Sequence, residues 1–195
     1  MSKELKSTLL DRDKLPVLCP THRHAPEFWE LLGRTVATFG FLEEVLGRAI
    51  FALTATRQYA DDKIEAAYQE WLPLLEKALT DQLWNLADSF GAAAKKNQSA
   101  TSQNVPALVD ALKTATVFRN VLCHGSWGAP DANGASVPFF VNKKKEIFPD
   151  AIDLTYLQKI QTEAAQLAYD VIDTVTHAGW KFPGTVGPGK SIMER

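Results

Sequence analysis

Cysteine is scarce in this chain, neither sign of charge is in excess, and no apolar run is long. Only Cys19 and Cys123 occur in 195 residues, too few for a small domain held together by disulfides. Because 21 Lys and Arg stand against 23 Asp and Glu, any site for a polyanion must be a local patch. The most apolar stretch, residues 28–53, contains five charged residues, which excludes a bilayer span.

The composition is that of one soluble domain with its own core, with 46% hydrophobic and 23% charged residues. No apolar leader is visible after Met1, so we expect a cytoplasmic protein with no membrane partner. We expect an irregular N-terminal arm over residues 1–26, a helical domain over residues 27–180 and a flexible C-terminal tail over residues 181–195.

Apolar residues at spacings of three and four predict a first long amphipathic helix over residues 28–53. Gly33, Gly40 and Gly47 are seven residues apart on this helix, although a glycine inside a helix costs about 1 kcal/mol relative to alanine. This stripe predicts the close approach of a neighbouring backbone, either from the same chain or from a second copy.

The same spacing predicts a second helix from an acidic start at Asp62 to Gly91. Pro73 lies inside it, so we expect a kink or a division near residues 71–72. Residues 92–104 are small and polar, which is typical of an exposed loop.

Two more helices follow, each with a side chain that can cap its start. Asn104 precedes a helix that ends at Gly125, and Asp153 precedes one that ends at Gly179. Between them the helical period is lost, and Asn133-Gly134 is typical of a β-hairpin turn. The predicted fold is therefore mainly all-α, an antiparallel four-helix bundle with a small β-hairpin inserted between helices three and four.

The strongest candidate site lies at the end of the third helix, where residues 119–124 read RNVLCH. Asn120 and His124 share one face of the helix, whereas Arg119 is offset from them by about 100° and 140°. A second copy of this helix end, facing the first across a two-fold axis, would complete a cationic cleft. The site therefore predicts a homodimer.

These residue types suit a phosphodiester. An imidazole such as His124 can take or give a proton near neutral pH, and Arg119 can bind two non-bridging oxygens while charge grows on them. Asn120 can orient the ring or the phosphate. The set requires no metal, and we expect no cofactor.

The arrangement of Arg119, a polar Asn120 and, after three residues, His124, near the end of the third of four helices, resembles the HEPN domains (higher eukaryotes and prokaryotes nucleotide-binding). Many of these are metal-independent endoribonucleases of toxin–antitoxin, phage-defence and RNA-processing systems, whose paired motifs form one site in a dimer. The resemblance implies that Arg119 and His124 are the catalytic pair and that Asn120 supports them. It implies attack by the ribose 2′-hydroxyl, which leaves a 2′,3′-cyclic phosphate and a 5′-hydroxyl.

Two alternatives stay open at this stage. The bundle can be a non-catalytic module that docks a partner, such as an antitoxin or a nucleotidyltransferase, or holds a nucleotide. The helix end can also be structural, with Arg119 paired to Glu43 or Glu44 and His124 bound to backbone carbonyls.

Two further features near the motif are candidate contacts for RNA. Lys143, Lys144 and Lys145 form either a patch that follows phosphates or a solvated turn. Trp127 either stacks on a base or covers the core, and the second is commoner for aromatic residues.

Two other motifs are better explained without a ligand. Residues 184–191 satisfy the phosphate-loop expression G-x4-G-K-[ST], but no parallel β-sheet precedes them, so we interpret the match as a coincidence. Cys19, His22 and His24 offer three zinc ligands, yet no fourth is apparent, which favours an ordinary polar arm and no metal.

Overall fold

The computed structural model describes residues 9–57, 59–97, 100 and 104–184, and this part of the chain is mainly helical, which confirms the all-α class. Within these residues there are five α-helices: α1 (Pro26–Ala55), α2 (Ile64–Thr80), α3 (Leu83–Lys96), α4 (Val105–His124) and α5 (Leu154–His177).

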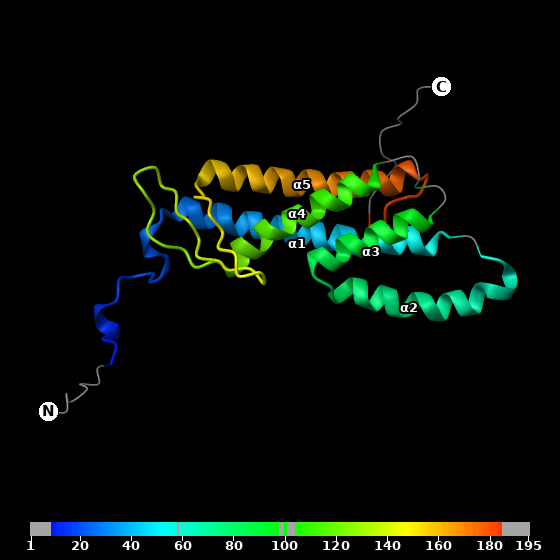
Figure 1. Ribbon diagram of the computed structural model, residues 1–195, viewed down its shortest axis with the longest axis horizontal. Coiled ribbons are helices and arrows are strands. Elements are labelled where there is room, and N and C mark those ends of the chain that lie inside the picture. Colours follow the sequence, from blue (N-terminus) through cyan, green and yellow to red (C-terminus); the bar gives the residue numbers. More distant parts are fainter. Residues whose placement is uncertain (1–8, 58, 98–99, 101–103, 185–195) are drawn as a thin grey trace, which may run out of the picture.

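Successive helices run in opposite directions, while α1 and α5 run side by side in the same direction and make the most extensive contact in the molecule (Figure 1). α3 packs on α1 and α4, and α2 lies outermost against α1. The core contains the fully buried side chains of α1 together with apolar residues of α3, α4 and α5. Its largest members include Phe39, Leu42, Leu46, Phe90, Leu112 and Leu157.

The predicted second helix is two helices, and its division lies at Asp81 and Gln82, not near residues 71–72. Pro73 stays inside α2, on an exposed position where water can bind the carbonyl that the proline leaves unpaired. At Asp81 and Gln82 the backbone is extended, and the following Leu83 is buried in the core. Burial of Leu83 therefore accompanies the division, and Pro73 does not cause one.

The helix α3 does not end at Gly91, as the sequence predicts, but continues to Lys96. Residues 92–96, which the sequence assigns to a loop, form its last turn. Ala93 and Ala94 are buried there, and alanine is a strong helix former, so packing and propensity agree.

The predicted starts of the last two helices are confirmed by their caps. The side chain of Asn104 accepts a hydrogen bond from the backbone N–H of Ala107 at 3.4 Å, at the start of α4. Oδ1 of Asp153 accepts one from the N–H of Tyr156 at 2.7 Å, at the start of α5.

The insert between α4 and α5 reverses at the predicted position, but it forms no β-strand among the described residues. The carboxylate of Asp131 accepts hydrogen bonds from the N–H groups of Asn133 and Ala135, and Gly134 has a φ of +81°. The pairing is limited to three isolated antiparallel bridges, which join Ser126 to Phe139, Ser136 to Ile152 and Val141 to Ile147. Residues 136–141 thus pair in turn with different segments, and no ladder becomes long enough to make the expected hairpin.

The predicted close approach to the glycine stripe is present only at Gly47, where a Cβ atom would lie 3.5 Å from the carbonyl oxygen of Ala78 in α2. At Gly33 and Gly40 a Cβ atom would meet nothing within 4 Å, so no neighbour in the described chain approaches these two, and a contact with a second copy there stays a prediction. The contact with α2 includes Gly47 but does not reach the first half of α1.

The last residues of the arm and the first residues of the predicted tail contact the helical body, whereas residues 9–20 are all exposed. His24 of the arm is buried, and Phe182, which the sequence places in the tail, is 3% exposed and belongs to the core. Residues 185–191 of the phosphate-loop pattern lie outside the described residues. Among the helices that the structure describes, none is both long and apolar enough to cross a membrane.

Candidate active site at the end of α4

The predicted site residues lie where α4 ends, which is also the end of the bundle where α1 and α5 begin (Figure 1). The backbone N–H of Gly125 donates to the carbonyl of Val121 at 2.8 Å and closes the last turn. A Cβ atom on Gly125 would lie 2.5 Å from that oxygen and 3.0 Å from Cβ of Pro138. The glycine therefore permits the insert to approach the helix end closely.

Arg119 contacts α1 through Glu43. Its Nε lies 3.3 Å from Oε1 of Glu43, and each side chain is only 24% exposed. The direction is too poor for a hydrogen bond, and Oε1 of Glu43 is buried without one, so the attraction is one of charge. The neighbouring Glu44 pairs with Arg48 instead. In the described chain no group accepts a hydrogen bond from the Arg119 guanidinium, which leaves its N–H groups for a ligand.

The two other motif residues are accessible. His124 is exposed at the last position of α4, and Asn120, one turn earlier, is half-buried. Neither side chain makes a hydrogen bond to another described residue, so the carbonyl contacts of the structural alternative are not seen for His124.

Aromatic side chains support the helix end from the side of α5. The ring of Phe118, next to Arg119, lies 6.2 Å from Tyr156 and 6.3 Å from Phe148, centroid to centroid. Burial, and then the carboxylates of Asp150 and Glu163, raise the pKa of Tyr156. The folded protein therefore holds the proton of this phenol to a higher pH than an exposed tyrosine does.

Trp127 does not form an open platform. It is half-buried, and its ring meets that of Phe28 edge to face at 5.0 Å between centroids. The same aromatic cluster includes His24, whose ring stacks on Phe28 at 4.0 Å. The position of Trp127 agrees with the interpretation as a cover of the core.

Lys143, Lys144 and Lys145 are all exposed in a tight turn beyond the bridges of the insert. The side-chain oxygen of Asn142 accepts hydrogen bonds from the N–H groups of Lys144 and Glu146, which hold this turn. The lysines are thus presented together on an ordered part of the surface.

The arm does not assemble a zinc site from Cys19, His22 and His24. Nε2 of His24 lies 3.1 Å from the carbonyl oxygen of Gly128 and 3.1 Å from Oγ of Ser136, so this nitrogen is occupied by the insert. Cys19 and His22 are exposed. Within the described ranges no three His, Cys, Asp or Glu side chains are grouped to hold a metal ion.

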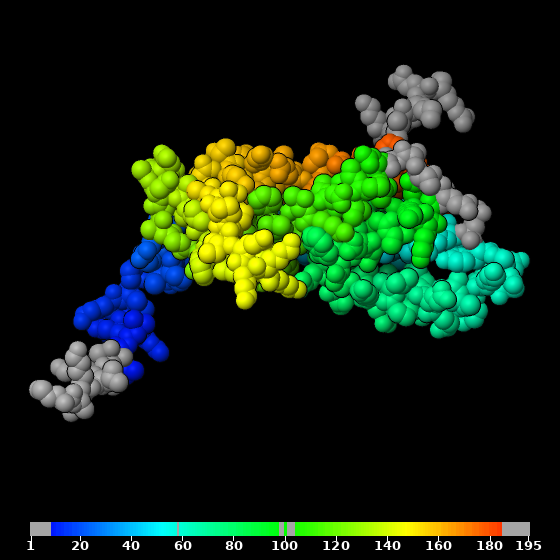
Figure 2. Space-filling model, viewed as in Figure 1, coloured from blue at the N-terminus to red at the C-terminus, as the bar shows by residue number. Residues whose placement is uncertain are grey.

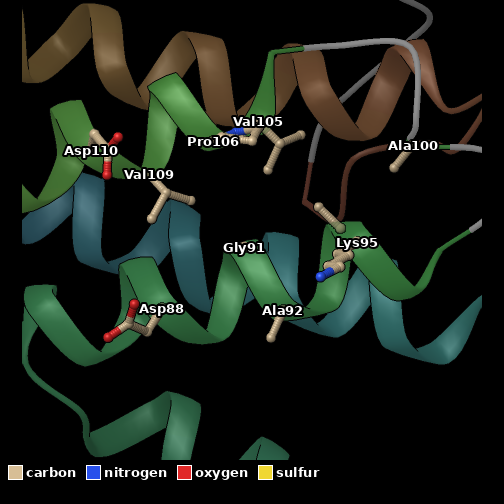
Figure 3. A pocket seen from close by; sticks show the side chains of 10 residues that line it. Asp88, Gly91, Ala92, Lys95, Ala100, Val105, Pro106, Val109 and Asp110 are labelled. Carbon is tan, nitrogen blue, oxygen red and sulfur yellow. The ribbon is translucent and has the colours of Figure 1, made fainter.

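A cavity of about 570 Å³ lies elsewhere, between α3 and the first turns of α4. Figure 3 shows its lining, in which Val109 points toward Gly91 and the charges of Asp88, Lys95 and Asp110 lie at the margin. None of the predicted site residues lines it, because Arg119 and His124 lie at the opposite end of α4.

Comparisons with protein-family models, with curated proteins and with solved structures found no match to this chain.

Proposed function

We propose that this chain is a metal-independent endoribonuclease of the HEPN type, which acts in the cytoplasm as a homodimer through Arg119, Asn120 and His124. The observation that carries the proposal is the end of α4, where an accessible imidazole without a partner among the described residues follows a partly covered guanidinium. That combination supplies a proton-transfer group and an anion-binding group within two helical turns.

In the proposed reaction the ribose 2′-oxygen attacks the adjacent phosphorus. A bond between the 2′-oxygen and phosphorus forms, the bond between phosphorus and the 5′-oxygen breaks, and a 2′,3′-cyclic phosphate and a 5′-hydroxyl remain. One His124 imidazole takes the proton of the 2′-hydroxyl, and the protonated His124 of the second copy gives its proton to the leaving 5′-oxygen. The guanidinium of Arg119 binds the non-bridging oxygens, where negative charge increases.

A second copy is part of the proposal because one helix end directs its groups apart. Arg119 lies toward Glu43 of α1, whereas Asn120 and His124 share a different face of α4. Two-fold pairing of α4 ends would place the imidazoles and guanidinia around one phosphate. The resemblance to HEPN domains implies a toxin–antitoxin or phage-defence setting for such an enzyme, and an antitoxin or a nucleotidyltransferase as the partner we propose.

Incubation of the purified protein with RNA in EDTA tests the proposal, with end-group analysis for cyclic phosphate. We expect cleavage by the wild type and a loss of about 10²-fold or more for His124→Ala and Arg119→Ala. His177→Ala is the matched control, because His177 is also an exposed last residue of a helix, and it should cleave like the wild type. Equal cleavage by the wild type and the two site variants contradicts the proposal.

A non-catalytic binding module is the second candidate, and the contact between Arg119 and Glu43 favours it, since a carboxylate already faces the cation. In that case the protein binds its partner or a nucleotide without turnover. A crystal structure of the assembled protein separates the two functions. The enzyme requires both His124 side chains in one shared cleft, whereas the binding module leaves them apart or covers them.

A further inference from the structure

The insert between α4 and α5 exposes apolar side chains to solvent. Residues 136–141 alternate, with Ser136 and Pro138 buried and Phe140 half-buried, whereas Val137, Phe139 and Val141 are exposed. Phe139 is 64% exposed, more than any other exposed aromatic side chain of the described residues. Apolar side chains that are exposed together, as Val137, Phe139 and Val141 are, can mark an interaction site, whereas a single exposed one is ordinary.

Phe139 lies next to the end of α4. The N–H of Ser126 donates to the carbonyl of Phe139 at 3.0 Å, and the N–H of Phe139 donates to the carbonyl of Ser126 at 2.8 Å. Residues that exchange both bonds have Cα atoms about 5.5 Å apart. Since Ser126 is two residues after His124, their Cα atoms are at most about 7.6 Å apart. The Cα atoms of Phe139 and His124 are therefore at most about 13 Å apart.

The backbone that carries this ring is held in place before any ligand binds. The paired bonds to Ser126 hold the backbone of Phe139 on one side, and the N–H of Phe148 donates to the carbonyl of Phe140 at 3.1 Å on the other. A ring on an ordered backbone loses little conformational entropy when a ligand stacks on it.

The same segment leads from the ring to the lysine turn. Lys143 follows Phe139 by four residues, which is about 13 Å of extended chain, and Lys144 and Lys145 complete the turn. Figure 2 shows this part of the insert, drawn in yellow, projecting from the surface of the molecule. Glu146 is the acidic neighbour, and its carboxylate accepts a hydrogen bond from Asn142 at 2.7 Å.

We propose that Phe139 is a stacking platform for an unpaired base of a single-stranded RNA, and that Lys143, Lys144 and Lys145 bind the phosphates that follow it. This inference rests on the proposed function, since it assigns the substrate class of the same site. An aromatic ring followed by clustered cations matches a single strand, whose bases are free to stack and whose phosphates repeat. A duplex keeps its bases stacked inside and offers none to the ring. The lysines favour RNA over a second copy of this nearly neutral chain as the occupant.

Binding of a fluorescein-labelled single-stranded RNA oligonucleotide to His124→Ala protein, which is impaired in cleavage, tests the proposal. We expect Phe139→Ala to weaken binding about ten-fold and Phe139→Trp to retain it. Val137→Ala is the matched control, an exposed apolar residue of the same row without a ring, and it should bind as before. Replacing the three lysines by alanine should reduce the slope of log K against log salt by about 2.

Three results overturn the proposal: unchanged binding of Phe139→Ala, equal loss with Val137→Ala, or duplex RNA bound as tightly as single strands. Sedimentation of the same variants tests whether a second copy of the chain covers Phe139 instead of RNA. If Phe139→Ala dissociates a dimer, Phe139 lies in an interface between copies.

The proposed function is tested separately. If the wild type cleaves RNA while Phe139→Ala binds normally, only the platform fails; if the wild type never cleaves but binding depends on Phe139, only the nuclease fails.

Discussion

Nε of Arg119 lies 3.3 Å from Oε1 of Glu43, so opposite charges join the last turns of α4 to the middle of α1. The contact is largely covered but imperfectly directed, because Oε1 of Glu43 has no hydrogen bond. Such a pair holds the guanidinium beside α1 without a hydrogen bond between the two side chains. Whether Arg119 is catalytic or structural, this contact determines where its guanidinium lies.

We expect Arg119 and Glu43 to be energetically coupled. Glu43→Gln should lower the free energy of unfolding by about 1 kcal/mol, and the double variant Glu43→Gln with Arg119→Met should lose less than the sum of the singles. Urea denaturation of the four proteins measures the coupling. Glu44→Gln, which breaks the exposed pair with Arg48, is the control and should change stability by less than about 0.5 kcal/mol. Strict additivity for Glu43 and Arg119 would show that the contact contributes nothing.

Gly125→Ala should displace the end of α4 from the insert. Its Cβ atom would lie 2.5 Å from the carbonyl oxygen of Val121 and 3.0 Å from Cβ of Pro138, so the backbone has to move. We expect a loss of about 1–3 kcal/mol in the free energy of unfolding. Gly128→Ala is the control, because nothing lies within 4 Å of its Cβ position. Wild-type stability of Gly125→Ala would refute the close approach.

His24 should anchor the arm to the insert. His24→Ala removes the contacts of Nε2 with Gly128 and Ser136 and the stacking on Phe28, so we expect a loss of about 1–3 kcal/mol. His22→Ala, on an exposed position of the same arm, should stay within about 0.5 kcal/mol of the wild type. Thermal unfolding compares the two variants, and equal effects would mean that the buried contacts contribute no stability.

Tyr156 predicts a dependence of stability on alkaline pH. Burial, Asp150 and Glu163 raise the pKa of this phenol above 10.0, so the folded protein keeps a proton that the unfolded chain releases. The stability this group contributes is complete below pH 10 and decreases as the pH rises toward the folded pKa. We expect Tyr156→Phe to show a shallower fall of unfolding free energy above pH 10 than the wild type. Parallel curves from denaturant titrations at several alkaline pH values would contradict the prediction.

Local chemistry made part of the fold predictable. The side chains of Asn104 and Asp153 cap the helices that they precede, and each cap involves only residues three positions apart. The period of buried residues along α1, from Phe28 to Leu53, is likewise visible in the sequence. By contrast, the division at Asp81 accompanies the burial of Leu83 in the core, and the sequence pattern predicts the division about ten residues earlier.

The candidate site shows the same contrast. Arg119, Asn120 and His124 lie at one helix end because they fall within six consecutive residues, RNVLCH, that a glycine follows. Their relative positions depend only on the geometry of one helix. The sequence offered both Glu43 and Glu44 as partners of Arg119, and only the packing of α4 on α1 selects Glu43. Phe139 is not among the predicted site residues, because residues 137–141 are a continuous apolar run in the sequence and only the structure shows which of them are exposed.

The amino-acid sequence by itself thus determined the helical class, the starts of α4 and α5 and the grouping of three polar residues, since each follows from neighbours within one or two turns. Only the tertiary structure decided that Gly33 and Gly40 face no backbone of the described chain, that Trp127 is half-covered and that Phe139 is exposed. Periodicity tells which residues share a face, but the covering of a face depends on contacts between segments far apart in the chain.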